Sequence, residues 1–243
     1  MRPDEEPQQP LTQGTPAGPT GEPVLERVPG QWPGMFGVYK YSKQAVKVNL
    51  GPIVLFVILA ALLGGASDVF SSRKDVVTPL VVVLLGLLIN AALYITQIAG
   101  VRGQKISAVD AVSKAFTKWP RLILLTILVT ISYAVSLLLL IVPFFFVMPR
   151  LSLANYFLVD QHMGVLKAYK ASWRATKGYT VEPWSIYAVN VLIALLVLTI
   201  IGIPFAIYFY IMYSAAFAVL YELLRGRAET QTEAVIPPPA ATE

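Results

Sequence analysis

Six apolar runs alternate with short polar segments along the chain. They cover residues 50–66, 77–99, 120–141, 143–159, 183–201 and 203–224. A helix needs roughly 20 apolar residues to cross a hydrocarbon core of ~30 Å, which is close to the length of these runs. Strands of a membrane barrel would place a polar residue at every second position, whereas the stretch 192–198 contains none. The pattern therefore predicts six transmembrane helices.

The six runs form three pairs, and a proline opens the second run of each pair. These prolines are Pro79, Pro143 and Pro204. Proline suits the first turn of a helix, where the backbone N–H has no partner within the helix. With the prolines in register, small or amide residues align eleven positions later, and such residues let helices pack closely in lipid. We expect an all-α membrane protein of three repeated helix pairs; chance alignment of apolar sequence is the alternative.

A short basic segment that also carries aromatic residues precedes each pair. The three segments cover 35–47, 107–119 and 165–178. In the second, Ser107 and Asp110 have the spacing of a capping box, which predicts the start of a helix. We expect each segment to form an amphipathic helix that lies in the membrane interface and precedes its helix pair.

The third basic segment separates charged from aromatic positions most clearly. Its basic face comprises Lys167, Lys170, Arg174 and Lys177. The opposite face comprises Leu166, Tyr169 and Trp173, and Gly178 supplies a stop signal. A basic face of this kind is attracted to anionic lipid headgroups, by about 1 kcal/mol per basic residue. The alternative is that the segment only fixes the topology.

Composition and charge agree with a membrane protein. Hydrophobic residues make up 56% of the 243 residues and charged residues only 14%, against roughly 25% charged in soluble domains. The net charge of +5 comes from lysines and arginines that gather in the basic segments and after the last apolar run. By the positive-inside rule these regions and both chain ends face the cytoplasm. The charge is thus a topology signal and not a nucleic-acid footprint.

The ends of the chain differ from the apolar region between them. Residues 1–34 hold eight of the eighteen prolines, and residues 228–243 are polar with three consecutive prolines. Such segments cannot bury enough apolar surface to offset their conformational entropy. The N-terminal one also lacks the basic start and apolar stretch of a secretory signal. We expect disordered cytoplasmic tails on either side of a membrane domain at 35–227.

Arg150 is the one charged residue that lies inside a predicted span and away from the ends of the span. An arginine at the centre of a span costs roughly 2.5 to 3.5 kcal/mol on insertion scales, so such residues usually have a polar partner or face water. The acidic residues lie at the ends of the spans or outside them, and we expect an amide such as Asn155, a carbonyl, water or an anion as the partner. The alternative is an anchor whose side chain reaches up to the headgroups.

The sequence contains no motif for catalysis. It has no cysteine, which excludes disulfides, thiol nucleophiles and thiolate metal sites. His162 is the only histidine, whereas a structural zinc site needs about four ligands. The amides Asn90, Asn155 and Asn190 are better explained as bonds between helices than as a polar path. We expect no enzyme activity, no cofactor, no metal and no nucleic-acid partner.

A group of residues between 150 and 178 forms a pattern that hydropathy does not require: Arg150, Leu153-Ala154, Val159-Asp160, Gly164-Val165, Ala168, Ser172-Trp173 and Thr176-Lys177-Gly178. This pattern resembles the YciC-like bacterial integral membrane proteins, which are grouped with the membrane domain attached to glycerophosphoryl diester phosphodiesterases. The resemblance is strongest over about 105–224. It implies a multi-helical membrane domain, and not catalysis, because the phosphodiesterase activity of such fusions belongs to a separate soluble barrel of roughly 250 residues.

These observations predict a non-enzymatic multi-pass protein of the bacterial cytoplasmic membrane. We expect it to bind anionic lipid or a membrane partner and to support envelope organisation. The alternative is a transporter or channel-like protein for an anionic or lipid substrate, which discontinuous helices would favour. Neither a protein partner nor an oligomeric state follows from the sequence. The candidate binding residues are Arg150, Asn155, Lys167, Lys170, Arg174 and Lys177, and the structural positions are Pro79, Pro143, Pro204, Ser172, Trp173 and Gly178.

Overall fold

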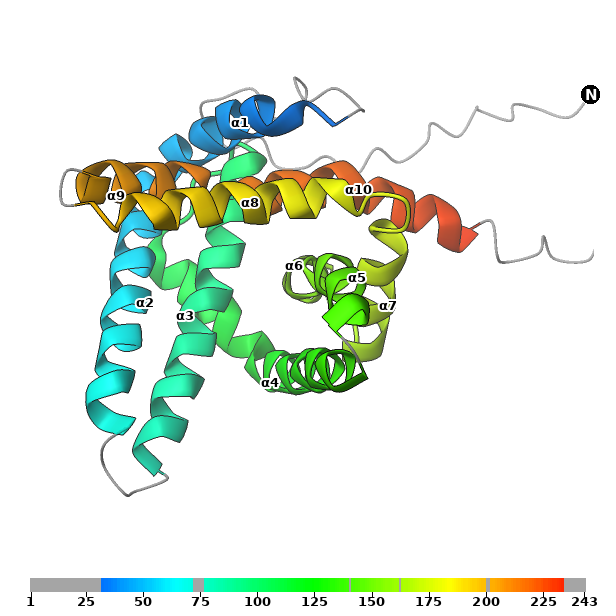
Figure 1. Cartoon of the computed structure of the whole chain (residues 1–243), viewed down its shortest axis with the longest axis horizontal. Helices are drawn as coiled ribbons and strands as arrows, with labels where there is room; N and C mark the ends of the chain where they lie inside the picture. The colour runs from blue at the N-terminus through cyan, green and yellow to red at the C-terminus, as the bar shows by residue number, and fades with distance from the viewer. Residues whose placement is uncertain (1–31, 72–76, 140, 162, 200–201, 234–243) are drawn as a thin grey trace, which may run out of the picture.

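The computed structural model describes residues 32–71, 77–139, 141–161, 163–199 and 202–233. Within these ranges every regular element is a helix, which confirms the all-α prediction. The helices are α1 (Gly34–Val48), α2 (Leu50–Ser71), α3 (Val77–Val101), α4 (Ala108–Leu139), α5 (Ile141–Leu151), α6 (Ala154–Asp160), α7 (Val165–Ala175), α8 (Val181–Leu196), α9 (Gly202–Tyr213) and α10 (Ala216–Glu233) (Figure 1). Most of the predicted N-terminal tail, the last ten residues and His162 lie outside the described residues. The helix α10 continues beyond residue 227, where the sequence analysis placed the start of the C-terminal tail.

Three stretches are long and apolar enough to cross a membrane. They are Val77–Val101, Ala108–Leu139 and Gly202–Arg225, the last combining α9 with the start of α10. A fourth is obtained if α1 and the first part of α2, which are bent by 99° at their junction, count as one span. The helix α8 is apolar but shorter. Length and composition of the described helices thus support membrane association with three or four spans.

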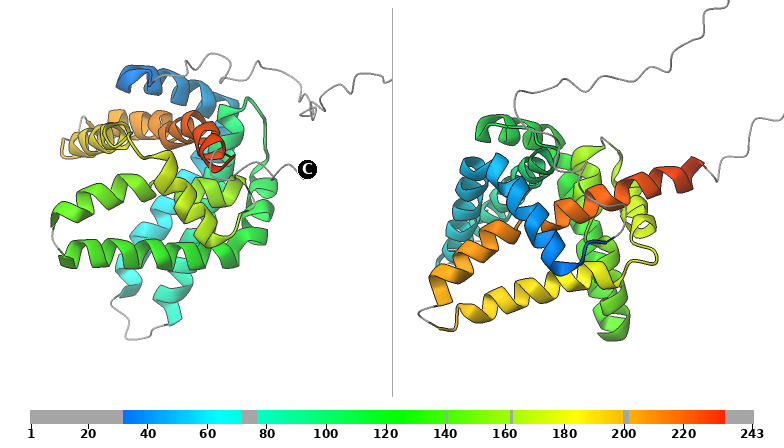
Figure 2. Two further views of the ribbon diagram at one scale, coloured as in Figure 1. Left: turned by 90° about the vertical axis from the view of Figure 1, so that its right-hand side faces the viewer. Right: turned by 90° about the horizontal axis from the view of Figure 1, so that it is seen from above.

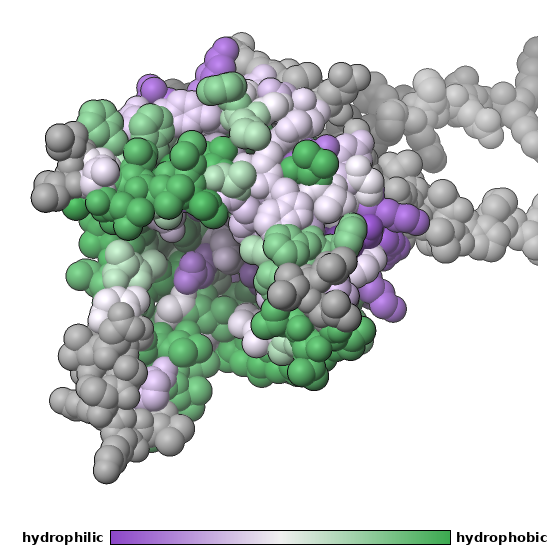
Figure 3. All heavy atoms as spheres, in the orientation of Figure 1, coloured by the Kyte–Doolittle hydropathy of each residue, from purple (hydrophilic) through white to green (hydrophobic). Residues whose placement is uncertain are grey.

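The helix pairs α2–α3, α4–α5 and α8–α9 leave a common centre in different directions (Figures 1 and 2). Their outer parts expose large apolar side chains, as at Leu80 on α3, Leu138 on α4 and Leu198 after α8, which are 55%, 88% and 81% exposed. Figure 3 shows this apolar surface over α8–α9 and along α4. Apolar areas of this extent on a protein surface indicate contact with lipid or with another protein.

The core lies where α3, α6 and α10 converge. The C-terminal half of α3 contacts α6 and α10, and α6 also contacts α10. The helices α1 and α7 and the first part of α4 pack around this centre through small side chains, such as Ala45, Ala111 and Ala168, all fully buried. At Gly100 of α3 a β-carbon would lie 2.5 Å from the carbonyl oxygen of Ala45, so only glycine lets α1 approach this closely.

Two apolar runs that hydropathy treats as continuous are broken into two helices each. The runs 143–159 and 203–224 become α5–α6 and α9–α10. Both breaks begin with a serine whose hydroxyl donates to the carbonyl three residues earlier: Ser152 to Pro149 at 2.8 Å, and Ser214 to Ile211 at 2.8 Å. Serine hydroxyls that bind nearby carbonyls compete with helical hydrogen bonding and favour turns.

Each break is also braced by a buried serine from an amphipathic helix. Ser172 on α7 donates to the carbonyl oxygen of Arg150 at 2.6 Å, and Ser42 on α1 donates to that of Met212 at 2.7 Å. Arg150 and Met212 are each the last residue but one of the helix before the break. The serines thereby bind carbonyls near helix ends, where the regular helical donors run out.

The prediction of a separate interfacial helix at 107–119 is wrong in one respect. This segment and the following apolar run form one continuous helix, α4, with Pro120 inside it. The predicted start is confirmed, because the N–H of Asp110 donates to the hydroxyl of Ser107 at 3.1 Å. Proline at 120 lacks an N–H and so leaves unpaired the carbonyl four residues earlier, but the helix continues on either side.

The side of α7 that packs against the protein is lined by small residues. Its buried residues are Ala168, Ala171, Ser172 and Ala175, whereas Leu166 is 64% exposed and Trp173 is 37% exposed. Small side chains bring α7 close to α6 and α10, which leaves the larger apolar residues outside the contact. The protein itself therefore covers the aromatic face of α7 only in part.

Candidate functional site

A network of ion pairs joins the C-terminal ends of α3 and α6 to α10. Arg102, directly after α3, donates through Nη1 and Nη2 to both carboxylate oxygens of Asp160 at 2.7 and 2.6 Å. Its Nε donates to Glu222 of α10 at 2.6 Å. Arg225 contacts both acids at 3.4 and 3.3 Å, and the Tyr221 hydroxyl donates to Asp160 at 2.7 Å. We call these five residues the ion cluster.

The ion cluster is shielded from solvent, so its charges depend on one another. The side chains of Glu222 and Asp160 are only 2% and 12% exposed. Burial alone would raise the pKa of Asp160, but the hydrogen bonds from Arg102 and Tyr221 outweigh burial and hold that pKa below its usual range. Burial alone would lower the pKa of Arg102, but Asp160 and Glu222 raise it above its ordinary value. Asp160 and Arg102 are therefore both ionised at neutral pH.

A tight turn and a buried amide place Arg102 and the loop after it. The turn after α3 has Gly103 at a φ of 71°. The Gln104 N–H donates to the Ala99 carbonyl and the Gly103 N–H to the Gly100 carbonyl, as in a Schellman motif. Asn49, at the junction of α1 and α2, then binds the loop on both sides. Its Nδ2 donates to the Gln104 carbonyl at 2.8 Å, and its Oδ1 accepts from the Ile106 N–H at 3.0 Å.

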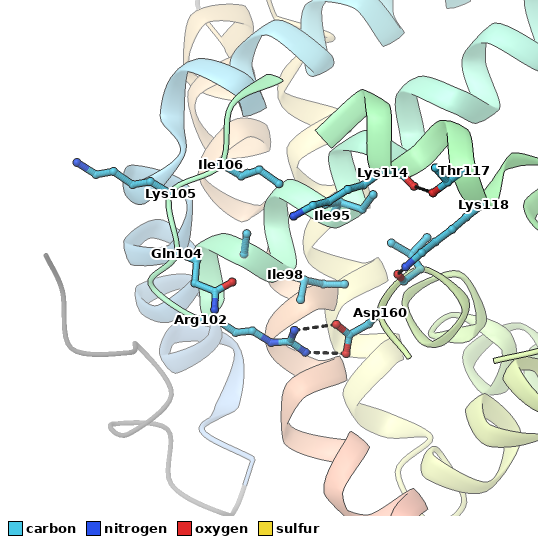
Figure 4. Close-up of a pocket in the computed structure, with 12 residues that line it drawn as sticks. Ile95, Ile98, Arg102, Gln104, Lys105, Ile106, Lys114, Thr117, Lys118 and Asp160 are labelled. Atoms are coloured by element: carbon cyan, nitrogen blue, oxygen red, sulfur yellow. Dashed lines mark hydrogen bonds and ion pairs between the residues drawn. The ribbon is translucent and has the colours of Figure 1, made fainter. Parts of the chain in front are cut away.

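A cavity of about 400 Å³ opens beside the ion cluster, between the end of α3, the loop 102–106, α4 and α6. We call it the basic pocket. It is lined by Ile95, Ile98, Ala99, Arg102, Gln104, Lys105, Ile106, Lys114, Thr117, Lys118, Val159 and Asp160. Figure 4 shows Lys114 reaching into it, Lys118 donating to the Val159 carbonyl, and Lys105 extending away from it.

The basic pocket carries positive charge that its own acid does not balance. Asp160 is engaged by Arg102, whereas Lys105 and Lys114 form no ion pair within the described ranges. Isoleucines form part of the wall below Lys114 (Figure 4). An amine over an apolar wall suits a monovalent or divalent anion such as a phosphate group. Among the described residues no group of acidic or histidine side chains could hold a metal ion.

The structure gives Arg150 a partner that the sequence analysis did not consider. Its guanidinium lies 5.0 Å from the centre of the Trp173 ring, which is a cation–π contact. Arg150 is in the last turn of α5, next to the break, and not in the middle of an unbroken helix. Its carbonyl also accepts from Thr176 at 3.3 Å. Asn155 is not its partner, since the buried Asn155 Oδ1 has no hydrogen bond among the described residues.

The other predicted binding residues fall on α7. Lys170 and Arg174 line a shallow cavity of about 380 Å³ together with Tyr169 and Trp173. Lys167 and Lys177 are exposed and lie outside that set. Gly178 has a φ of 88° in the turn after α7. Pro79, Pro143 and Pro204 are each the third residue of their helix, in the first turn.

Sequence analysis missed the ion cluster and the basic pocket. Arg102, Asp160 and Glu222 were treated as charges flanking separate spans, 58 to 120 positions apart, and nothing in hydropathy pairs them. One signal was available: each follows a predicted second helix or lies near its end. Charged residues at equivalent positions of repeated helix pairs can be expected to contact one another.

Comparisons of the chain with protein-family models, with curated proteins and with solved structures find no match. The resemblance to YciC-like membrane proteins therefore stays a prediction.

Proposed function

We propose that this chain is a non-enzymatic multi-pass membrane protein that binds anionic lipid on its cytoplasmic side and supports envelope organisation. The observation that carries the proposal is the basic pocket, in which Lys114 has no ion-pair partner among the described residues and stands above isoleucine side chains. A lipid phosphate is the anion most available to a protein whose surface is this apolar. The exposed lysines of α7 add attraction for the same headgroups.

The proposal includes six spans arranged as three helix pairs in a bacterial cytoplasmic membrane, with both chain ends in the cytoplasm. Its support is the matched pair of helix breaks, each opened by a serine and each braced by a buried serine of an amphipathic helix. The distribution of basic residues supports the orientation. The resemblance to YciC-like proteins, with their multi-helical membrane domain, is part of the same proposal.

This topology requires the three diverging helix pairs to enter one bilayer from the side of the ion cluster. Because the chain has no cysteine, single cysteines can be placed at Ser71, Ser107 and Thr230 and probed on intact cells with an impermeant maleimide. We expect labelling at Ser71 only. Labelling of Ser107 or Thr230 without Ser71 would show the opposite orientation.

The lipid function is tested by native mass spectrometry. The full-length protein is purified in detergent and mixed with equal amounts of phosphatidylglycerol and phosphatidylcholine. We expect phosphatidylglycerol to be retained in preference, and the preference to fall as salt is raised, because exposed charges are screened. Equal retention of the two lipids at low salt contradicts the proposal.

The two broken apolar segments favour a second candidate, a transporter of an anionic or lipid substrate. Discontinuous helices are common at transporter binding sites, and the break after α5 carries Arg150. Proteoliposomes with labelled phosphatidylglycerol in one leaflet test this candidate. Transfer between leaflets that depends on the protein would support it, whereas retention of the lipid without transfer would leave binding as the function.

A further inference from the structure

A second cavity lies on the other side of α4 from the basic pocket. It has a volume of about 560 Å³ and runs between α2 and the first part of α4; we call it the apolar groove. Its lining is Leu55, Phe56, Leu59, Ala108, Val109, Val112, Ser113, Phe116 and Thr117. Thr117 lines both the apolar groove and the basic pocket, so the two cavities flank the same stretch of α4.

The apolar groove presents large apolar side chains at the surface of the protein. Val109 is 78% exposed and Phe116 is 59% exposed, and Phe116 stacks on Trp119 with 5.6 Å between ring centres. One wall of the groove, with Leu55 and Leu59, belongs to a run predicted to span the membrane. The groove is thus bordered by a predicted apolar span, while Lys114, in the same stretch of α4 as Val112 and Phe116, lines the basic pocket.

We propose that one phospholipid with a negatively charged headgroup binds across α4, with its phosphate at Lys114 in the basic pocket and one acyl chain along the apolar groove. This inference rests on the proposed lipid function and makes it specific to a single site. The neighbouring basic and apolar cavities match the two ends of an anionic amphiphile, whereas a free phosphate would use only the basic pocket. Asp110, the exposed acid of this helix face, is held by the hydroxyl of Ser107 at 2.7 Å, outside both linings.

The test uses the full-length protein in detergent and separates the two ends of the ligand. Lys114→Gln removes the charge in the basic pocket, and Lys40→Gln on α1 is its matched control, since Lys40 is also exposed but lines neither cavity. Val109→Trp fills the apolar groove from an exposed position, and Leu124→Trp, 59% exposed further along α4, is its control. Retention is measured for dioleoyl phosphatidylglycerol, for dihexanoyl phosphatidylglycerol and for inorganic phosphate.

We expect Lys114→Gln to lower retention of the long-chain lipid about fivefold, the effect of one basic residue near a headgroup. Val109→Trp should lower it about tenfold, as when roughly two methylene groups leave an apolar environment. The wild-type protein should bind the six-carbon lipid at least about tenfold more weakly than the long-chain lipid. The two control variants should match the wild type, which shows that substitution of an exposed residue does not by itself reduce binding.

Three results would overturn parts of the argument in different ways. If Val109→Trp retains lipid like its control and chain length has no effect, the acyl-chain site is wrong, although lysine-dependent lipid binding stands. If inorganic phosphate is bound as tightly as the long-chain lipid, the ligand is a soluble anion. If phosphatidylglycerol shows no advantage over phosphatidylcholine in any variant, the proposed function itself fails.

Discussion

Arg102 donates two parallel hydrogen bonds to Asp160, at 2.7 and 2.6 Å, although the two residues are 58 positions apart in the sequence. The pair ties the end of α3 to the end of α6, and the third bond of Arg102, to Glu222, adds α10. Planar two-point contacts of this kind fix geometry as well as contributing energy. The three helix pairs thus diverge from a centre that is held by charge, next to the basic pocket.

Removal of Arg102 should destabilise the protein strongly. Arg102→Met leaves Asp160 and the nearly buried Glu222 without their main partner, and loss of one member of a buried ion pair costs about 3 kcal/mol or more. Arg225→Met is the control, because Arg225 is 39% exposed and its bonds are longer, so its loss should cost about 1 kcal/mol or less. Thermal unfolding in detergent measures both. Equal shifts would mean that the ion cluster does not hold the helices together.

The contribution of Asp160 to stability should depend on pH only in acid. Its folded pKa lies below the model-peptide value of 3.8, so the stabilisation is present above about pH 4 and is lost as pH falls through the folded pKa. Unfolding of the wild type and of Asp160→Asn should be followed from pH 7 down to pH 3. We expect a constant difference above pH 5 that narrows below pH 4. A difference that changes between pH 5 and 7 would point to another titrating group.

Two glycines of α3 should respond in opposite ways to the same substitution. Gly100→Ala places a β-carbon 2.5 Å from the Ala45 carbonyl, and such overpacking costs about 1 to 3 kcal/mol. Gly86→Ala meets no atom within 4 Å, and alanine is favoured over glycine in a helix by about 1 kcal/mol. Thermal unfolding of the two variants should therefore shift in opposite directions. A destabilised Gly86→Ala would show that this part of α3 packs against something else.

The serine that braces the second break should be worth a measurable part of the stability. Ser42→Ala removes the donor to the Met212 carbonyl, and an unsatisfied buried carbonyl costs about 1 to 3 kcal/mol. Ser113→Ala, at an exposed position of α4, should have almost no effect. The midpoint of thermal unfolding distinguishes the two variants. If Ser42→Ala matches Ser113→Ala, the brace is not a structural requirement.

Arg150 should matter less than its sequence position suggests. Arg150→Leu removes the contact with Trp173, worth about 1 kcal/mol, but keeps the backbone carbonyl that Ser172 and Thr176 bind. We expect a small change in stability and an unchanged preference for phosphatidylglycerol, in contrast to Lys114→Gln. Loss of that preference in Arg150→Leu would move the lipid site to α7.

Hydropathy predicted the helical class and most helix positions because burial in lipid or in a core leaves a periodic trace in the sequence. The Ser107 cap was also readable, since it depends on residues three positions apart. The breaks after α5 and α9 were not predicted, because one serine in an apolar run hardly changes its mean hydropathy. The ion cluster could not be predicted for a different reason. It depends on how the ends of α3 and α6 pack against α10, and packing between distant segments leaves no local pattern in the sequence.

The ion cluster pairs two guanidinium groups with two carboxyl groups, so the formal charges of these side chains sum to zero. A balanced set of charges exerts little net field beyond its own size, and the potential in the basic pocket is therefore set by the lysines. Glu222→Gln would add one uncompensated positive charge behind the pocket without altering any residue of its lining. A substitution in the ion cluster can in this way change the attraction of the basic pocket for anions, although the substituted residue does not line the pocket.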